Sequence, residues 1–157
     1  MHHRLTRDLP YPAEDLFDLV ADVESYPRFV PWITELRTWN RRAESLGVTT
    51  LDAEAKIGFG PFGERFSTRV RMARPNLAID VTLLSGPFHR LENRWRFEPR
   101  PGGAQLAFEI DFELRSALLE RLLAANFERA AATLVRCFEA RAAELYGGNE
   151  WKRPTGS

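Results

Sequence analysis

The feature that most constrains the fold is a period-two alternation of apolar and polar residues that recurs between residues 51 and 114. In its clearest run the apolar positions are Leu106, Phe108, Ile110, Phe112 and Leu114. Because successive side chains of a strand point to opposite faces, each such run predicts a strand with one buried face. The connections between runs are short, which favours antiparallel neighbours in chain order. We expect six strands in a meander between residues 33 and 114, after a first strand over residues 3–9.

The inner face of this sheet needs an apolar cover, which two helical segments can supply. Pro12 suits the first turn of a short helix whose apolar face comprises Leu16, Leu19, Val20 and Val23. The segment from Ser116 to Gly147 predicts one continuous helix of about thirty residues, or ~45 Å, with an apolar stripe. Between these segments, Pro27 and Pro31 leave room for only a turn or two of helix. The expected fold is α+β: a curved antiparallel sheet wrapped around a long C-terminal helix, with two short helices after the first strand.

Length and charge narrow the class of protein. The 157 residues suit one domain, which we place at residues 1–146, and the polar, glycine-led tail over residues 147–157 is expected to be disordered. The 22 basic and 22 acidic residues cancel, so no net basic field favours DNA as a partner. Cys137 is the single cysteine, which excludes an internal disulfide, and the first ten residues lack the apolar run of a signal peptide. We therefore expect a cytoplasmic protein.

Aromatic residues gather in three connections that strand parity places at one end of the sheet. These connections are the approach to the first meander strand, the turn at residues 58–64 and the turn at residues 85–89. Their aromatic residues are Tyr26, Phe29, Trp32, Phe59, Phe62 and Phe88. The turns at the opposite end are polar, as exposed loops usually are. The aromatic end favours the mouth of an apolar pocket between helix and sheet, although a plug for the core or a surface that contacts a membrane fits the same pattern.

The segment YPRFVPW, residues 26–32, resembles a Tyr-Pro-x-Phe-x-Pro-Trp signature of the coenzyme Q-binding proteins and the ribosome-association toxins called RatA. The later segments GPFHRLENRWRF and DFELRSALL are similar to the same family, which belongs to the START-like polyketide cyclase/dehydrase superfamily with its helix-grip fold. The resemblance covers residues 3–146. Family members often have a cysteine after the signature tryptophan, where this chain has Ile33.

The resemblance implies a lipid-binding domain with a pocket for ubiquinone or another polyprenyl quinone. The protein would then act as a quinone chaperone that supports respiratory electron transport, with transient contact to the inner membrane and no required cofactor. By the same resemblance, the pocket entrance would comprise Tyr26, Pro27, Phe29, Val30, Pro31 and Trp32. The pocket wall would comprise Leu91, Asn93, Trp95 and Phe97. Two alternatives have the same origin: a toxin-like protein that binds the large ribosomal subunit and blocks subunit association, and a polyketide cyclase-like enzyme.

Polar residues that could perform chemistry are scarce in the expected core. Asn93 is the one polar residue on an apolar strand face, and it either satisfies a structural hydrogen bond or donates to a ligand carbonyl. His89 has no obvious carboxylate or nucleophile beside it in the sequence, and His2 and His3 would point to opposite faces of a strand. No catalytic residue and no metal site is therefore predicted, which favours a binding protein over an enzyme.

Overall fold

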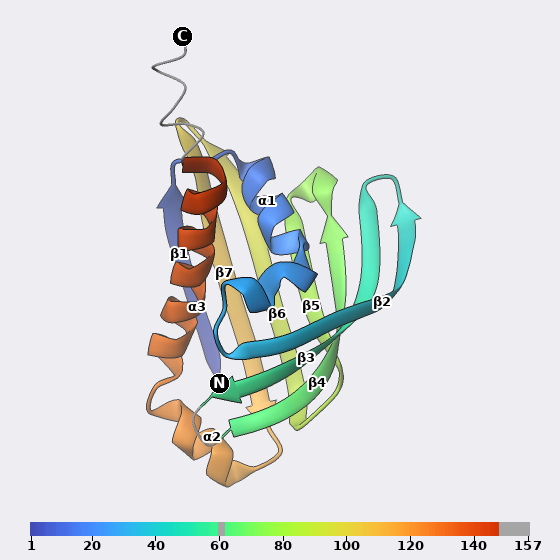
Figure 1. Cartoon of the computed structure of the whole chain (residues 1–157), viewed down its shortest axis with the longest axis vertical. Helices are drawn as coiled ribbons and strands as arrows, with labels where there is room; N and C mark the ends of the chain where they lie inside the picture. The colour runs from blue at the N-terminus through green and yellow to red at the C-terminus, as the bar shows by residue number, and fades with distance from the viewer. Residues whose placement is uncertain (60–61, 148–157) are drawn as a thin grey trace.

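The computed structural model describes residues 1–59 and 62–147 of the chain (Figure 1). Its strands are β1 (His2–Leu9), β2 (Ile33–Ser45), β3 (Val48–Phe59), β4 (Phe62–Ala73), β5 (Ala78–Ser85), β6 (Phe88–Arg100) and β7 (Gly103–Leu114). Its α-helices are α1 (Ala13–Ala21), α2 (Ala117–Ala124) and α3 (Phe127–Ala142). Shorter helical segments are the 3-10 helices η1 (Val23–Arg28) and η2 (Arg74–Asn76) and the π-helical turn η3 (Ala143–Gly147).

The seven strands form one antiparallel sheet in the order β1-β7-β6-β5-β4-β3-β2. The six-strand meander predicted from the alternation is confirmed, and β1 joins it by pairing with β7 from His2↔Asp111 to Leu9↔Ala104. The sheet curves, and α1, η1 and α3 lie on its concave side (Figure 1). This is the predicted α+β helix-grip arrangement, with the two short helices directly after the first strand.

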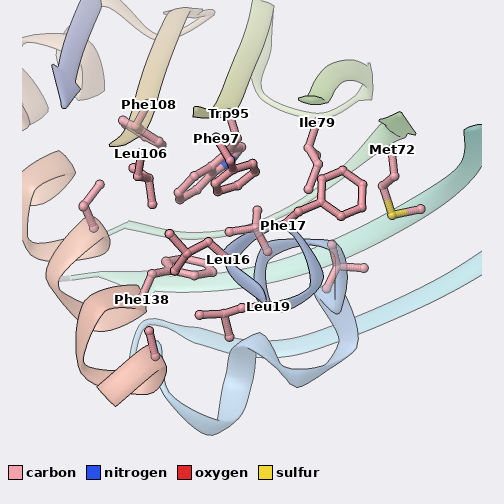
Figure 2. Packing of buried hydrophobic residues seen from close by; sticks show 14 of the residues in the cluster. Leu16, Phe17, Leu19, Met72, Ile79, Trp95, Phe97, Leu106, Phe108 and Phe138 are labelled. Carbon is pink, nitrogen blue, oxygen red and sulfur yellow. The ribbon is translucent and has the colours of Figure 1, made fainter. Parts of the chain in front are cut away.

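The main core lies between these helices and the sheet. Figure 2 shows Leu16 and Phe17 of α1 and Phe138 of α3 directed toward side chains of the strands, including Trp95, Leu106 and Phe108, and Leu19 of α1 belongs to the same cluster. All of these side chains are buried. The alternation of β7 is visible in its burial, because Ala104, Leu106 and Phe108 face the core while the residues between them are only half-buried. Burial of the inward positions therefore fixes which face each strand turns to the helices.

The C-terminal helical segment differs from the expectation of one continuous helix. The chain leaves helical geometry at Asn126, whose φ is −127° and ψ is 11°, and α3 begins at the next residue. Asparagine favours helix N-terminal positions over helix interiors, because its short amide competes for local backbone groups. Ser116 does cap α2 as expected, since its side chain accepts a hydrogen bond from the Leu119 amide at 3.2 Å. The change of direction separates α2 from α3.

The prediction that alternate connections of the meander lie at the same end of the sheet is confirmed. The start of β2, the β3–β4 turn, the start of β6 and the end of β7 share one end, as the registers Phe59↔Phe62 and Phe88↔Leu114 require. The expected disordered tail lies outside the described residues from residue 148 onward, and the structure does not bear on it. The end where β6 begins and β7 finishes is also the end that α2 covers (Figure 1).

Candidate ligand cavity

An apolar cavity of about 190 Å³ lies between the helices and the aromatic end of the sheet. Its wall takes side chains from β3, β4, β6, β7, α2 and α3, together with the residue before β2. The lining residues are Trp32, Ile57, Phe66, Phe88, Leu91, Phe108, Ile110, Phe112, Leu123, Phe127, Ala130, Ala131 and Leu134. The chain therefore has an unfilled apolar space at the end of the sheet where the sequence places the pocket.

Aromatic rings hold the cavity wall in place. Phe88 of β6 meets Phe66 at 5.4 Å and Phe112 at 6.0 Å between ring centroids, and Phe112 meets Phe127 of α3 at 5.0 Å. All three contacts are edge to face, the arrangement that the ring quadrupole favours. Gly86 lets the β5–β6 turn approach this wall, because its φ is +146° and a β-carbon there would lie 2.5 Å from the Phe66 Cβ.

The structure brings only some of the predicted site residues to the cavity. Trp32, Phe88 and Leu91 line it. Val30, Trp95 and Phe97 are buried in the main core instead. Pro27 lies within η1, and Pro31 is exposed just before β2. The side chains of Phe59 and Phe62 lie outside the part of the chain that the structure describes.

Tyr26 and Phe29 pack against the core and do not line the cavity. Their rings pack edge to face on Phe138 of α3, with centroids at 5.1 and 5.0 Å. The Tyr26 hydroxyl donates to the Val20 carbonyl, which ties η1 to α1. Burial raises the pKa of Tyr26, helped by the nearby Asp22 carboxylate, so the phenol keeps its proton. These two aromatic residues anchor the proline-broken segment to the core.

Asn93 has hydrogen-bond partners for both ends of its amide. Its Nδ2 donates to the Glu109 carbonyl at 2.8 Å, and its Oδ1 accepts from the Trp95 Nε1 at 2.8 Å. Trp95 is buried, so its indole N–H cannot bond to water, and the Asn93 Oδ1 supplies the acceptor that it needs. Of the two alternatives for Asn93, the geometry supports the structural one.

We expect Asn93→Leu to lower the free energy of unfolding by about 1–3 kcal/mol, because it leaves the buried Trp95 N–H without an acceptor. Chemical denaturation measures this loss, and titration with a quinone is expected to show the same affinity as the wild type. The double variant Asn93→Leu/Trp95→Phe removes both partners and should lose less than the sum of the single changes. A loss of ligand affinity without loss of stability would instead make Asn93 a ligand donor.

The helix α2 covers the cavity end of the sheet with few packed side chains. None of its residues is buried; Leu119 and Leu123 pack against the cluster around the cavity, while Leu118 and Leu122 are 65% and 53% exposed. Residues four apart share one face of a helix, so the two exposed leucines form one apolar strip on the outer side. Few packed contacts and a break at each end make α2 the least anchored part of the wall.

The described residues offer little for catalysis. Within residues 1–59 and 62–147, no group of three His, Cys, Asp or Glu side chains is placed to hold a metal ion. Cys137 is half-buried on α3, and burial raises the pKa of its thiol. Among the same residues, no helix is both long and apolar enough to cross a bilayer.

Sequence reasoning missed most of the cavity wall. The missed residues are Ile57, Phe66, Phe108, Ile110, Phe112, Leu123, Phe127, Ala130, Ala131 and Leu134. All but Phe127 and Ala131 belong to the inward strand positions or to the apolar helix stripe that the sequence pattern indicates. Alternation tells which face a residue occupies, but not whether the space in front of it is filled.

A curved antiparallel sheet that holds a C-terminal helix over an apolar cavity defines the START-like helix-grip class. Comparison with known families agrees, because residues 9–139 match the model of a family described as "Polyketide cyclase / dehydrase and lipid transport". The match covers well over half of the chain, and the chain belongs to this family.

Two curated relatives and one solved structure are similar over most of the chain. The ribosome association toxin RatA of Pseudomonas aeruginosa is 36% identical over 140 residues, which cover 88% of this chain and 93% of the toxin. The mitochondrial coenzyme Q-binding protein COQ10 homolog B of Xenopus laevis is 32% identical over 146 residues, 90% of this chain but 58% of that protein. The solution structure of the 18 kDa protein CC1736 from Caulobacter crescentus is 52% identical, with a TM-score of 0.80, and the match covers 94% of this chain and 99% of that one. These relatives confirm the family that the YPRFVPW signature indicates.

Proposed function

We propose that this protein binds a hydrophobic lipid in the cavity between α2, α3 and the sheet, and that it acts as a carrier rather than an enzyme. The observation that carries the proposal is the cavity itself, because the thirteen lining residues that the structure describes are all aliphatic or aromatic. A general acid or base would have to reach a bound substrate, and none of the described lining residues has a carboxylate, an imidazole or a hydroxyl group. Such a wall suits binding that is driven by burial of apolar surface.

Burial of apolar surface can supply the affinity without polar contacts. Each buried methylene group contributes about 0.8 kcal/mol, so an isoprenoid segment of five carbons contributes about 4 kcal/mol before the cost of ordering. The named relative that binds coenzyme Q points to a polyprenyl quinone as the ligand. We therefore propose that the ligand is ubiquinone or a similar polyprenyl quinone. The protein would carry this quinone in support of respiratory electron transport.

A carrier must meet the membrane that holds such a lipid, and α2 fits this contact. The strip of Leu118 and Leu122 faces outward at the cavity end, and leucines of this kind bury readily at a bilayer surface. We propose that α2 contacts the inner membrane during lipid exchange. Displacement of α2 would also remove Leu123 from the cavity wall.

We expect Leu118→Ser/Leu122→Ser to slow transfer of a quinone between lipid vesicles about tenfold or more, because two side chains that would enter the bilayer are lost. Affinity for the same quinone in detergent should stay unchanged. Leu46→Ser is the matched control, since Leu46 is 96% exposed on the β2–β3 turn at the other end of the sheet. Equal transfer rates for the double variant and this control would contradict the proposed membrane contact.

Solvent extraction of the purified protein followed by mass spectrometry tests the proposed function. The expected result is a co-purified polyprenyl quinone. Ala130→Leu places three more carbon atoms in the cavity and should lower its occupancy, while Ala140→Leu on the exposed side of α3 should not. The proposal fails if no lipid is extracted and added quinone does not bind.

A second candidate function is association with ribosomes, which several relatives have in their names. A specific surface favours it: Trp39 of β2 is 40% exposed, and the Arg37 guanidinium lies 5.1 Å from its ring centroid. Arg41 and Arg42 follow, and neither has an ion pair within the described residues. An exposed tryptophan beside several arginines suits a base that stacks and phosphates that pair.

Salt-sensitive co-sedimentation with ribosomes tests this candidate. Binding that Arg41→Ser/Arg42→Ser abolishes would support it, with Arg115→Ser as a control at the other end of the sheet. Equal sedimentation of wild type and double variant would reject a role for this surface. The test is independent of the cavity, because these arginines do not belong to its wall.

A further inference from the structure

We propose that the cavity encloses one end of a branched hydrocarbon chain and leaves the polar head group of the ligand outside. The inference rests on the proposed lipid-binding function and deepens it, because it states which part of the ligand is recognised.

The described cavity wall has almost no hydrogen-bond donor or acceptor for a polar group of a ligand. Among the thirteen described lining side chains, the indole N–H of Trp32 is the only polar atom. The nearest candidate in the inward face of β6, Asn93, is engaged by Glu109 and Trp95 and does not line the cavity. The Tyr26 hydroxyl is likewise engaged by the Val20 carbonyl. The described wall would therefore present almost only hydrocarbon to a ligand.

A quinone ring is a poor occupant of such a space. It has two carbonyl oxygens on opposite sides of the ring, and both accept hydrogen bonds from water when the ring is exposed. A single indole N–H could serve at most one of them. An oxygen that is buried without a donor weakens binding by roughly tenfold or more, whereas an isoprenoid chain has no group that loses a partner.

The volume leads to the same conclusion. An apolar cavity of about 150 Å³ is known to hold one benzene ring, and this cavity measures about 190 Å³. It can enclose a branched segment somewhat larger than six carbon atoms. A quinone ring with its carbonyl oxygens, methoxy groups and methyl group is about twice as large as benzene and would need the wall to move, while the terminal unit of an isoprenoid chain fits as the structure stands.

The test compares three ligands that displace a fluorescent naphthalene sulfonate dye from the full chain. The ligands are the ubiquinone head group without a tail, the same head group with two isoprene units, and the ten-carbon hydrocarbon 2,6-dimethylocta-2,6-diene. We expect the hydrocarbon to compete within about tenfold of the prenylated quinone and the bare head group to be at least about 100-fold weaker. Binding of the head group within tenfold of the prenylated quinone would overturn the inference, as would failure of the hydrocarbon to compete with it. If none of the three binds, the proposed function itself fails and the inference with it.

Two variants separate the modes of binding further. Trp32→Phe removes the one N–H among the described lining side chains and leaves a smaller aromatic ring, so it should weaken the prenylated quinone and the hydrocarbon by the same factor. A tenfold or larger loss, with the affinity for the hydrocarbon unchanged, would show that the head group is inside. Ala130→Leu should weaken both ligands by the same factor, because it removes space that either chain would fill.

Discussion

Replacing Phe138 by alanine is expected to lower the free energy of unfolding by about 3–5 kcal/mol, the cost of removing a fully buried aromatic side chain. Phe138 is 2% exposed and lies where three parts of the fold meet. Its ring contacts Tyr26 and Phe29 of the proline-broken segment at 5.1 and 5.0 Å and Trp95 of β6 at 4.9 Å. The cavity left by alanine would face all three, and it cannot close without moving α3.

Thermal and chemical denaturation measure this loss, which corresponds to a fall in Tm of roughly 6–20 °C for a domain of this size. Phe138→Leu is the matched control, because it keeps most of the apolar volume and should cost less than half as much. Amide exchange in η1 should accelerate in the alanine variant, since Tyr26 and Phe29 lose their partner. A loss below about 1.5 kcal/mol would contradict the role of Phe138 as the anchor of that segment.

Gly103→Ala is expected to destabilise the protein by about 3 kcal/mol, at the upper end of the usual cost of overpacking. A β-carbon at Gly103 would lie 1.9 Å from the Leu9 carbonyl oxygen and 2.9 Å from the Pro10 Cα. Both obstacles are backbone atoms, so no side-chain rotation relieves the clash. β1 would have to separate from β7 at the Leu9↔Ala104 end of their ladder.

Denaturation again gives the magnitude, and faster amide exchange in β1 would locate the damage. Gly63→Ala on β4 is the control, because a β-carbon there meets nothing within 4 Å and its φ is not in the left-handed region. The control should stay within about 0.5 kcal/mol of the wild type. Equal stability of the two alanine variants would show that β1 is not held against β7 as the structure describes.

Strand alternation predicted the sheet well because burial acts on each strand separately. The positions Leu106, Phe108 and Phe112 read as inward from the sequence, and each is buried. Short connections then fixed the antiparallel order, and parity placed the aromatic connections at one end, where the cavity lies. These steps need only local patterns and chain length, which the sequence contains.

The helix break and the depth of each aromatic residue could not be predicted in the same way. Apolar residues recur on both sides of Asn126, so the periodicity alone does not indicate that the chain leaves helical geometry there. Tyr26 and Phe29 were placed at the mouth, but they pack on Phe138 because η1 folds back over the concave side. Periodicity gives the face of an element, whereas cavities depend on how several elements pack together.

We propose that a hydrophobic ligand occupies the cavity between the helices and the aromatic end of the sheet. The most direct measurement is an NMR titration of methyl-labelled protein with ubiquinone that carries two isoprene units. We predict contacts between the ligand and the methyl groups of Ile57, Leu91, Ile110, Leu123 and Leu134, all of which line the cavity. Leu46 and Leu145, which are exposed elsewhere, should not respond. Saturable binding that shifts the exposed leucines and leaves the five cavity residues unchanged would contradict the account.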